Sequence, residues 1–398
     1  MDTLLSILNA AFLIAGAATL VPVATLGLQI ACSCIPLRTR KPSGTERPPV
    51  AVIIPAHNEQ SGIARTINSI REQLKPSDRM ILIADNCTDD TADVARGLGA
   101  EVVVRADRTK IGKGYALDAG VKYLLSSDAP EIVLFVDADC VLAPDAITSL
   151  AHACATQDRP IQGLYLMTLP EEANIRQRIS AFAWSVKNDL RPRGYYRLGM
   201  PCLLMGTGMA LPIHLLDRLS LATDHITEDT VIGLKCALMG KPPAFCPDAV
   251  ITSEFAPTES GREIQKSRWI HGQLSALFEL GPLLVVAALR RRDPRLLALA
   301  ADTSVVPLGF LLIFVATLNL ATLCWFAATG HLWPLVLSVT SLVIAALALI
   351  AAWIKTGRNL LRLREIPDIL RHAARQLVVI KDYVVGQRAR WIRSERGH

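Results

Sequence analysis

The sequence predicts a mixed α/β domain with a mostly parallel sheet, attached to a helical part that lies in a membrane. Between residues 48 and 275, short apolar runs alternate with segments of helical periodicity, as in a sheet covered by helices on both faces. Two other stretches, 3–37 and 303–354, contain no Lys, Arg, Asp or Glu. A bilayer core takes about 20 apolar residues per helix, so these stretches have the length of one span and two spans.

Composition excludes several other classes of protein. Of the 398 residues, 51% are hydrophobic and 20% are charged, which excludes a disordered or fibrous chain. The 9 Cys are odd in number and contain no CxxC pair, unlike a disulfide framework or a zinc site. The net charge is +6, but residues 355–398 alone carry eleven Lys and Arg against four Asp and Glu. Because the excess belongs to one tail, we do not expect a nucleic-acid partner.

The first apolar stretch predicts an N-terminal transmembrane helix within residues 1–37. A cleaved signal peptide is the alternative, but no basic residue precedes the stretch, which is also longer than such peptides. Asp2 comes before the stretch, whereas Arg38, Arg40 and Lys41 follow it. Positive residues stay on the cytoplasmic side, so we expect the domain that follows to be cytoplasmic.

Residues 301–355 predict two further transmembrane helices. The apolar run 280–289 is shorter than a span and contains Pro282, so we expect 276–300 to form an interfacial or re-entrant segment. Three spans would return the chain to the side of the α/β domain. The basic segment 356–398 would then be a cytoplasmic tail.

The α/β domain, residues 48–275, begins with a regular alternation of elements. Strands are predicted at 50–55, 80–84, 101–104 and 131–136, and helices at 61–74, 89–98 and 114–125. Such a Rossmann-like sheet binds ligands beyond the carboxyl ends of its strands. The acidic residues at these positions are Glu59, Asp85, Asp137 and Asp139.

Asp137 and Asp139 form the strongest local signal for a metal site. Only one residue separates them at the end of a buried strand, where two unpaired negative charges would repel each other. A divalent cation removes that cost, and hard oxygen ligands favour Mg²⁺ or Mn²⁺. The sequence has neither a P-loop nor a GxGxxG after the first strand, which excludes those nucleotide-binding classes.

Six segments, in order along the chain, carry a resemblance to a known family. They are Pro55-Ala-His-Asn-Glu59, the strand end at Asp85, Lys113-Gly-Tyr-Ala-Leu117, Asp137-Ala-Asp139, Thr227-Glu228-Asp229 and Gln265-Lys-Ser-Arg268-Trp269. Together they resemble family 2 glycosyltransferases, and more narrowly the membrane-embedded branch with cellulose, hyaluronan and chitin-oligosaccharide synthases and ceramide glucosyltransferase. The resemblance covers residues 50–272. It implies a GT-A fold, a nucleotide-sugar donor, a divalent metal and inversion at the anomeric carbon.

The resemblance also implies roles on the donor side of the site. Asp85 matches the aspartate that binds the uracil ring, and Glu59 matches the glutamate beside the nucleoside. Lys113 matches a lysine beside the nucleotide, where a point charge suits phosphate, although a solvated loop lysine is the alternative. Asp137 and Asp139 match the pair that holds the metal on the diphosphate.

The segment from Thr227 to Asp229 is implied to carry the catalytic chemistry. Asp229 matches the general base that removes the proton of the acceptor hydroxyl. Glu228, on the acceptor side, is a candidate to tune the pKa of Asp229. A capping box at the start of helix 230–238 is the structural alternative, because Thr227 is a good N-cap residue, and both readings can hold together.

Gln265, Arg268 and Trp269 are spaced i, i+3 and i+4, so they share one face of a helix. The resemblance places Gln265 on the donor side. Arg268 can pair with the diphosphate, and Trp269 can stack on an acceptor sugar. Taken without the rest of the pattern, Trp269 would be an interfacial anchor next to the membrane.

Two further segments bear on the acceptor. Gly206, Thr207 and Gly208 resemble a small-residue segment that lets the acceptor approach closely. Apolar residues recur at helical spacing from Ile175 to Leu190. That pattern predicts either an amphipathic helix at the membrane surface or a helix that packs against another domain.

The function that we expect is an inverting transfer of a sugar from a nucleotide-sugar donor, with UDP favoured, to a membrane-associated acceptor. A polyprenyl-diphosphate-linked sugar in bacterial envelope or exopolysaccharide assembly is the favoured acceptor, which places the protein in the bacterial inner membrane. The alternatives are transfer to a ceramide-like lipid, processive synthesis of a polysaccharide, a nucleotidyltransferase, and an inactive membrane scaffold. Three spans offer little lining for a polysaccharide channel, so we expect one sugar or a few to be added.

Overall fold

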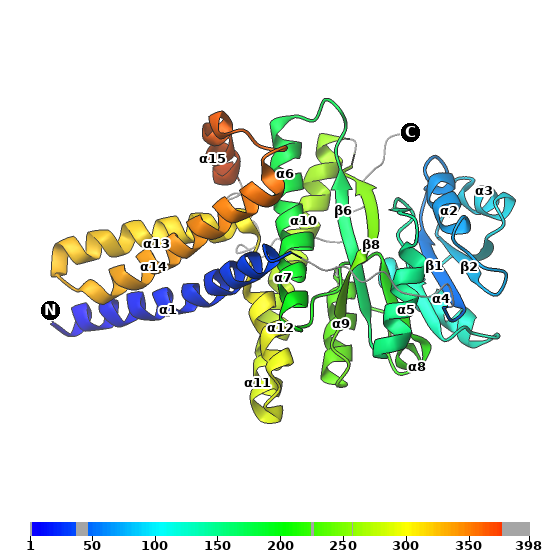
Figure 1. Cartoon of the computed structure of the whole chain (residues 1–398), viewed down its shortest axis with the longest axis horizontal. Coiled ribbons are helices and arrows are strands. Elements are labelled where there is room, and N and C mark those ends of the chain that lie inside the picture. Colours follow the sequence, from blue (N-terminus) through cyan, green and yellow to red (C-terminus); the bar gives the residue numbers. More distant parts are fainter. Residues whose placement is uncertain (1, 37–46, 224–226, 257, 376–398) are drawn as a thin grey trace.

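The computed structural model describes residues 2–36, 47–223, 227–256 and 258–375. It has two parts, an α/β domain and a long helical bundle that projects from one side of that domain (Figure 1). The basic residues Arg38, Arg40 and Lys41, together with 376–398 of the predicted tail, lie outside the described residues.

The α/β domain is built on one eight-stranded sheet in the order β3-β2-β1-β4-β7-β6-β8-β5. The strands are β1 Val50–Ala56, β2 Arg79–Asp85, β3 Glu101–Arg105, β4 Ile132–Phe135, β5 Val141–Leu142, β6 Ile161–Thr168, β7 Met209–Pro212 and β8 Ala244–Glu254. Strands β1 to β4 pair in parallel, β7 runs antiparallel between β4 and β6, and β8 pairs in parallel with β6. The predicted mostly parallel α/β sheet is confirmed.

Helices cover both faces of this sheet. In the α/β domain they are α2 Ile63–Arg71, α3 Thr91–Gly97, α4 Lys113–Leu125, α5 Ala146–Gln157, α6 Ile175–Ser185, η1 Val186–Leu190, α7 Arg191–Arg197, α8 Ile213–Leu216, α9 Glu228–Leu238 and α10 Glu259–Ser275. One apolar core joins α2 and α5 to the sheet, and the other joins α4, α8 and α9 to its opposite face. Alternate residues of β1 enter the two cores, because successive strand side chains point to opposite faces.

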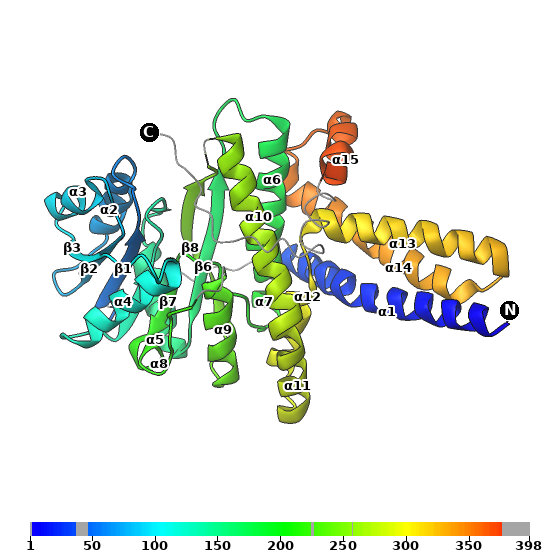
Figure 2. The same ribbon diagram turned by 180° about the vertical axis from the view of Figure 1, so that it is seen from behind.

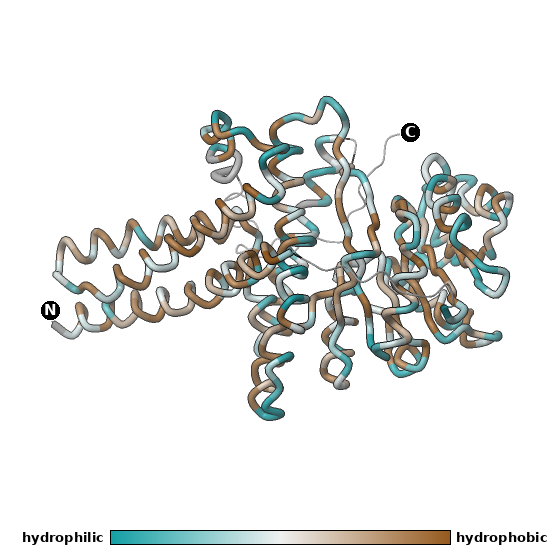
Figure 3. Tube along the Cα trace, viewed as in Figure 1, coloured by the Kyte–Doolittle hydropathy of each residue, from teal (hydrophilic) through white to brown (hydrophobic). Residues whose placement is uncertain are grey.

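The remaining helices form the bundle and its connections. They are α1 Asp2–Ser33, η2 Ala276–Leu280, α11 Gly281–Arg291, α12 Pro294–Ser304, α13 Leu308–Thr329, α14 Leu332–Ala352, η3 Trp353–Gly357, η4 Leu363–Glu365 and α15 Ile366–Arg375. Helices α1, α13 and α14 lie side by side and are predominantly hydrophobic along their length (Figure 3). Ile14, Leu320 and Leu347 are 70%, 63% and 62% exposed on the bundle, as expected for side chains that face lipid.

Among the described residues, four helical segments are long and apolar enough to cross a membrane: Thr3–Ser33, Gly261–Arg291, Leu308–Thr329 and Leu332–Gly357. This is one candidate more than the three spans predicted. The additional candidate arises because α10, η2 and α11 join into one helix, whereas the sequence suggested that the apolar run began only at 280. In Figures 1 and 2 this long helix lies across the axis of the bundle, beside the α/β domain. That orientation is compatible with a helix at the membrane surface.

The bundle is attached to the α/β domain through α6, η1, α7 and α12. The packing expected from the periodicity between Ile175 and Leu190 is confirmed, since these apolar residues join a core with α1, α13 and α14, while a place at the membrane surface stays a prediction. Polar side chains reinforce the attachment: Arg191 donates to Gln29 and to Asp302, and Gln29 donates to Asp302 at 2.6 Å. All three residues are buried, so the charge of Arg191 is paired where water is excluded.

Candidate active site

The carboxyl end of β4 carries Asp137 and Asp139, as the sequence predicted. The turn after the strand is fixed by Thr66, whose hydroxyl donates to the Ala138 carbonyl at 2.8 Å. Ser253 at the end of β8 donates to Asp139 Oδ2 at 2.9 Å. Two strands that are remote in sequence therefore orient one carboxylate, which no local pattern could indicate.

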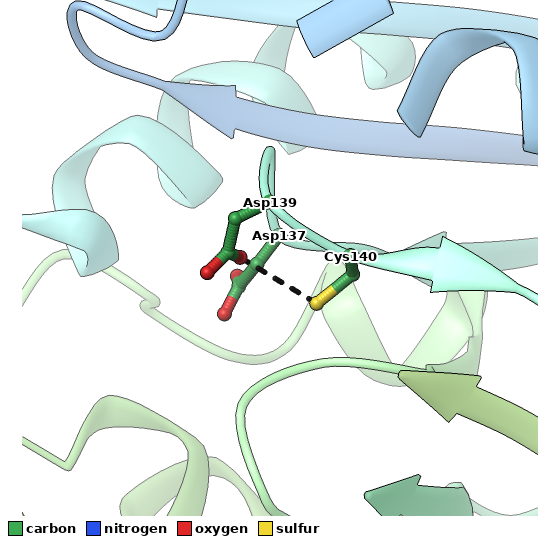
Figure 4. Close-up of side chains that lie close together, drawn as sticks. All are labelled: Asp137, Asp139 and Cys140. Carbon is green, nitrogen blue, oxygen red and sulfur yellow. Dashed lines mark hydrogen bonds between the residues drawn. The ribbon is translucent and has the colours of Figure 1, made fainter. Parts of the chain in front are cut away.

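Asp137, Asp139 and Cys140 lie together in the close-up (Figure 4), with their potential ligand atoms within 4.8 Å of one another. The Cys140 thiol donates to Asp139 Oδ1 at 3.5 Å, and burial raises the pKa of that thiol well above its usual value. Cys140 is therefore a neutral neighbour, and the two carboxylates are the donors. Two hard oxygen donors, one of which is also held by Ser253, suit Mg²⁺ or Mn²⁺.

Lys113, the first residue of α4, joins the acidic groups. Its Nζ lies 2.5 Å from Asp137 Oδ1 and 3.4 Å from Glu228 Oε1, and it donates to the Gly206 carbonyl at 2.7 Å. Burial would lower the pKa of Lys113, but the carboxylates of Asp137 and Glu228 outweigh it and raise the pKa. The lysine is not a solvated loop residue, and it links four segments that the sequence could only place separately.

Glu228 and Asp229 open α9 beside this lysine. Burial raises the pKa of both carboxyl groups, while the positive charge of Lys113 opposes that effect. Asp229 Oδ1 accepts from the backbone N–H of Thr230 at 2.6 Å. A half-buried carboxylate with a raised pKa and a fixed orientation has the properties of a general base.

The capping box predicted at Thr227 does not form. Thr227 is the residue before the first turn of α9, but its side chain accepts no hydrogen bond there and instead donates weakly to the Gly272 carbonyl at 3.4 Å. In a capping box the side chain three residues after the cap returns to it, and that residue here is Thr230, which is neither Glu nor Gln. The contact of Thr227 with α10 removes the other half of the expected cap.

The segment Gly206-Thr207-Gly208 lies against the same cluster. Gly206 has φ +87°, and a Cβ there would lie 3.3 Å from both Asp229 Oδ2 and Lys113 Nζ. The buried Thr207 hydroxyl accepts from the Asp137 backbone N–H at 3.0 Å. Gln162, which the sequence did not indicate, holds the segment by donating to the Thr207 carbonyl at 2.9 Å.

Asp85 and Glu59 form a separate group at the neighbouring strand ends. Asp85 Oδ1 pairs with Arg105 at 2.6 Å, and its carbonyl meets His57 Nδ1 at 2.5 Å. Glu59, in the turn after β1, is held by its backbone N–H, which donates to Thr91 at 2.8 Å. Arg105 was missed from the sequence, because its pairing with Asp85 depends on the register of β2 with β3.

Helix α10 brings Gln265, Arg268 and Trp269 to the site. Gln265 and Trp269 line one cavity, whereas the positive charge of Arg268 acts on Glu228 and, like that of Lys113, opposes the burial that raises its pKa. The Trp269 ring lies 4.4 Å from the Trp184 ring of α6, at 45°. Trp184 is the partner that the sequence did not identify, since α6 and α10 are far apart in the chain.

Two neighbouring hollows adjoin these aromatic rings. The larger, of about 680 Å³, lies between α6, α10 and the start of α13, with mostly apolar walls that include Ile179, Ile270 and Leu308. The smaller, of about 90 Å³, is lined by Asp229. Trp184 and Trp269 line both, so they separate a cavity beside the membrane bundle from the acidic cluster.

Comparison with known proteins identifies the class. Residues 48–272 match the family described as "Glycosyltransferase like family 2". This match covers more than half of the chain, which therefore belongs to the family 2 glycosyltransferases and is an enzyme of the transferase class. The resemblance noted in the six sequence motifs is confirmed.

Two solved structures are similar to this chain. A mannosyltransferase from Pyrobaculum calidifontis, solved with GDP-Man and Mn²⁺, has a TM-score of 0.54 and 21% identity over 93% of this chain and 99% of that chain. At this identity the likeness shows the GT-A fold alone. Glucosyl-3-phosphoglycerate synthase from Mycobacterium tuberculosis, solved with Mn²⁺ and UDP-Glc, has a TM-score of 0.40 and 21% identity, covering 57% of this chain and 78% of its own.

A curated relative is similar over a short region. The 4,4'-diaponeurosporenoate glycosyltransferase of Staphylococcus aureus is 38% identical over 107 residues, which is 26% of this chain. The match spans only 27% of that relative's length, about a quarter.

Proposed function

We propose that this protein is an inverting membrane glycosyltransferase that moves one sugar from a nucleotide-sugar donor to a lipid acceptor. One observation carries the proposal: Asp229 lies between the Lys113–Asp137 pair and the hollow that leads to the membrane bundle. A donor diphosphate on the first side and an acceptor on the second would meet at that carboxylate.

The donor side is assigned to the residues at the strand ends. Asp137 and Asp139 would hold Mg²⁺ or Mn²⁺, which supplies charge neutralisation for the departing diphosphate. Lys113 and Arg268 would bind phosphate oxygens, with Gln265 beside them, while Asp85 and Glu59 would bind the nucleoside. We favour a UDP-linked sugar, although the Pyrobaculum relative was solved with GDP-Man.

In the transfer step, the acceptor oxygen forms a bond to the anomeric carbon as the bond from that carbon to the diphosphate breaks. Asp229 takes the proton of the acceptor O–H, and the nucleoside diphosphate leaves with the electron pair of the broken bond. Attack from the face opposite the diphosphate inverts the anomeric centre. The carboxylate of Glu228, which is paired with Lys113, lies beside the base.

The acceptor would reach Asp229 past Trp269 and the Gly206-Thr207-Gly208 segment. Thr207 is buried, so its side chain supports the segment and the glycines provide the close approach. We favour a polyprenyl-diphosphate-linked sugar and a place in the bacterial inner membrane, with the α/β domain in the cytoplasm. The name of the Staphylococcus relative, a diaponeurosporenoate glycosyltransferase, is consistent with a lipid acceptor. A ceramide-like lipid and processive polysaccharide synthesis are the alternatives.

A nucleotide-release assay tests the proposal. The full chain in nanodiscs is incubated with Mn²⁺, a bacterial lipid extract and a panel of UDP-, GDP- and CDP-sugars. We expect one donor to be turned over with appearance of a labelled glycolipid. The Asp229→Asn variant is the matched control. The proposed function would be refuted if the wild type released nucleotide from none of the donors faster than this variant does.

A further inference from the structure

The larger hollow ends at a group of polar side chains that the proposed transfer does not use. Trp184, Lys187, Asn188 and Arg191 all line the smaller hollow with Asp229. They come from the end of α6, from η1 and from the start of α7. The turn η1 is π-helical, so successive residues lie closer in angle around the axis than in an α-helix. This widened turn explains how adjacent residues reach one pocket.

Asn188 has an unsatisfied amide at this position. The residue is 1% exposed, and neither Nδ2 nor Oδ1 has a hydrogen-bond partner among the described residues. Buried amide groups are nearly always paired, because leaving them without water or a partner is costly. Both a donor and an acceptor atom are therefore available to a ligand in the pocket that Asp229 shares.

Lys187 adds a positive charge at the point where the two hollows meet, since it lines both. Its ammonium lies 5.8 Å from the centre of the Trp184 ring, and no carboxylate of the described residues forms an ion pair with it. Nearby Arg191, in contrast, is already paired with Asp302 at 2.8 Å. Lys187 is thus a half-buried lysine that forms no ion pair in the described structure, although the charge of Asp229 acts on it from the same pocket.

We propose that Lys187 and Asn188 bind an anionic group of the acceptor, which is an amphiphile with an apolar chain. The chain lies in the hollow of about 680 Å³, which has the size of a site for a small organic ligand. The anionic group meets the ammonium of Lys187 and the amide of Asn188, and a hydroxyl beyond it reaches Asp229. This inference rests on the proposed function and adds to it the residues that bind the charged group of the acceptor. Phosphate and carboxylate share the required chemistry.

Binding of a matched series of probes tests this assignment without transfer. Farnesyl diphosphate, farnesoic acid and farnesol have the same chain and differ in the charge of the head. Labelled probes are bound to the full chain in phosphatidylcholine nanodiscs, and binding to empty nanodiscs is subtracted. We expect the wild type to bind one of the two anions at least about tenfold more tightly than farnesol. The preferred anion distinguishes a phosphate from a carboxylate source.

Variants then test which residues cause the preference for an anion over farnesol. Lys187→Met should remove most of this preference while farnesol binding changes less than about twofold. Lys187→Arg should restore the preference. Asn188→Leu, of similar size, should weaken the anion selectively. Lys235→Met, at an exposed lysine of α9, is the matched control and should match the wild type.

Two outcomes would overturn the inference: equal binding of farnesol and both anions by the wild type, or an undiminished anion preference in Lys187→Met. UDP binding, measured in parallel, should stay unchanged in all variants and shows that the donor domain is folded. If no sugar donor is turned over, the proposed transfer fails, but the probe comparison still decides whether this site selects an anion.

Discussion

Lys113 shows how single residues acquire a role from their surroundings. In the described structure its ammonium neutralises Asp137 and Glu228 and holds the Gly206 carbonyl. A cation at Asp137 and Asp139 would compete with Lys113 for the Asp137 carboxylate. Lys113 would then be able to pair with a phosphate oxygen of the donor. Binding of the metal and binding of the donor would therefore be coupled.

Asp229→Asn should abolish sugar transfer while leaving donor binding nearly intact. The base acts on the acceptor in the transition state, and its loss costs about 10²–10⁴ in rate. Turnover of the labelled donor and calorimetric binding of UDP would be compared for wild type and variant. A variant that keeps more than about half of its turnover would place the base elsewhere.

Asp139→Ala should remove the dependence of UDP binding on divalent metal. The Asp139 carboxylate is held by Ser253, so its removal deletes one of two metal donors without disturbing the Lys113 pair. Calorimetry with and without Mg²⁺ or Mn²⁺ measures the effect. Ser253→Ala is a milder companion variant, expected to weaken the metal response in the same direction, and a full metal response in Asp139→Ala would contradict the assignment.

At the scale of elements, the sequence predicts the structural features that depend on neighbouring residues and does not predict those that depend on contacts between distant segments. The strand at 50–55 is a continuous apolar run buried on both faces, so composition alone predicts it and the structure has it at Val50–Ala56. The pairing of Asp139 with Ser253 joins β4 to β8, and no local pattern encodes that register. Lys187 and Asn188 line one pocket from η1, which is a π-helical turn. Hydrophobic periodicity does not reveal such a turn.

The contact between α7 and α1 decides how the bundle is attached. Gly194 of α7 lies so close to α1 that a Cβ there would be 1.9 Å from the Gln29 carbonyl oxygen. Backbone atoms cannot rotate away, so a side chain must separate the helices or distort them.

Gly194→Ala should therefore destabilise the protein by about 1–3 kcal/mol or more, through overpacking between α7 and α1. Thermal unfolding in nanodiscs measures the change. Gly97→Ala, where an added Cβ meets nothing within 4 Å, is the matched control and should stay within about 1 kcal/mol of the wild type. An equal effect of the two substitutions would show that α7 and α1 do not approach as described.

For the whole molecule, the polarity of the bundle decides what can cross it. Thr322 and Ser338 hydrogen-bond at 2.6 Å between α13 and α14, and Asn319 donates to Ser338 at 3.3 Å. These polar groups satisfy one another, as is common between membrane helices. The bundle helices are instead predominantly hydrophobic along their length (Figure 3), and exposed side chains such as Leu320 and Leu347 suit lipid.

The protein should accordingly add one sugar, or a few, to its acceptor and should not extrude a long polymer. Sugar hydroxyls in hydrocarbon need a polar, water-filled path, and Asn319, Thr322 and Ser338 of α13 and α14 are engaged with each other. The site also opens through the two hollows toward the membrane bundle, where a lipid can present its head to Asp229.

Incubation of the enzyme in nanodiscs with labelled donor, followed by sizing of the product, measures the chain length. We expect label in a single lipid species with a lipid extract present and little product without it. Polymers of tens of sugars, formed without added lipid acceptor, would contradict this prediction and would require several copies of the chain to build the missing channel.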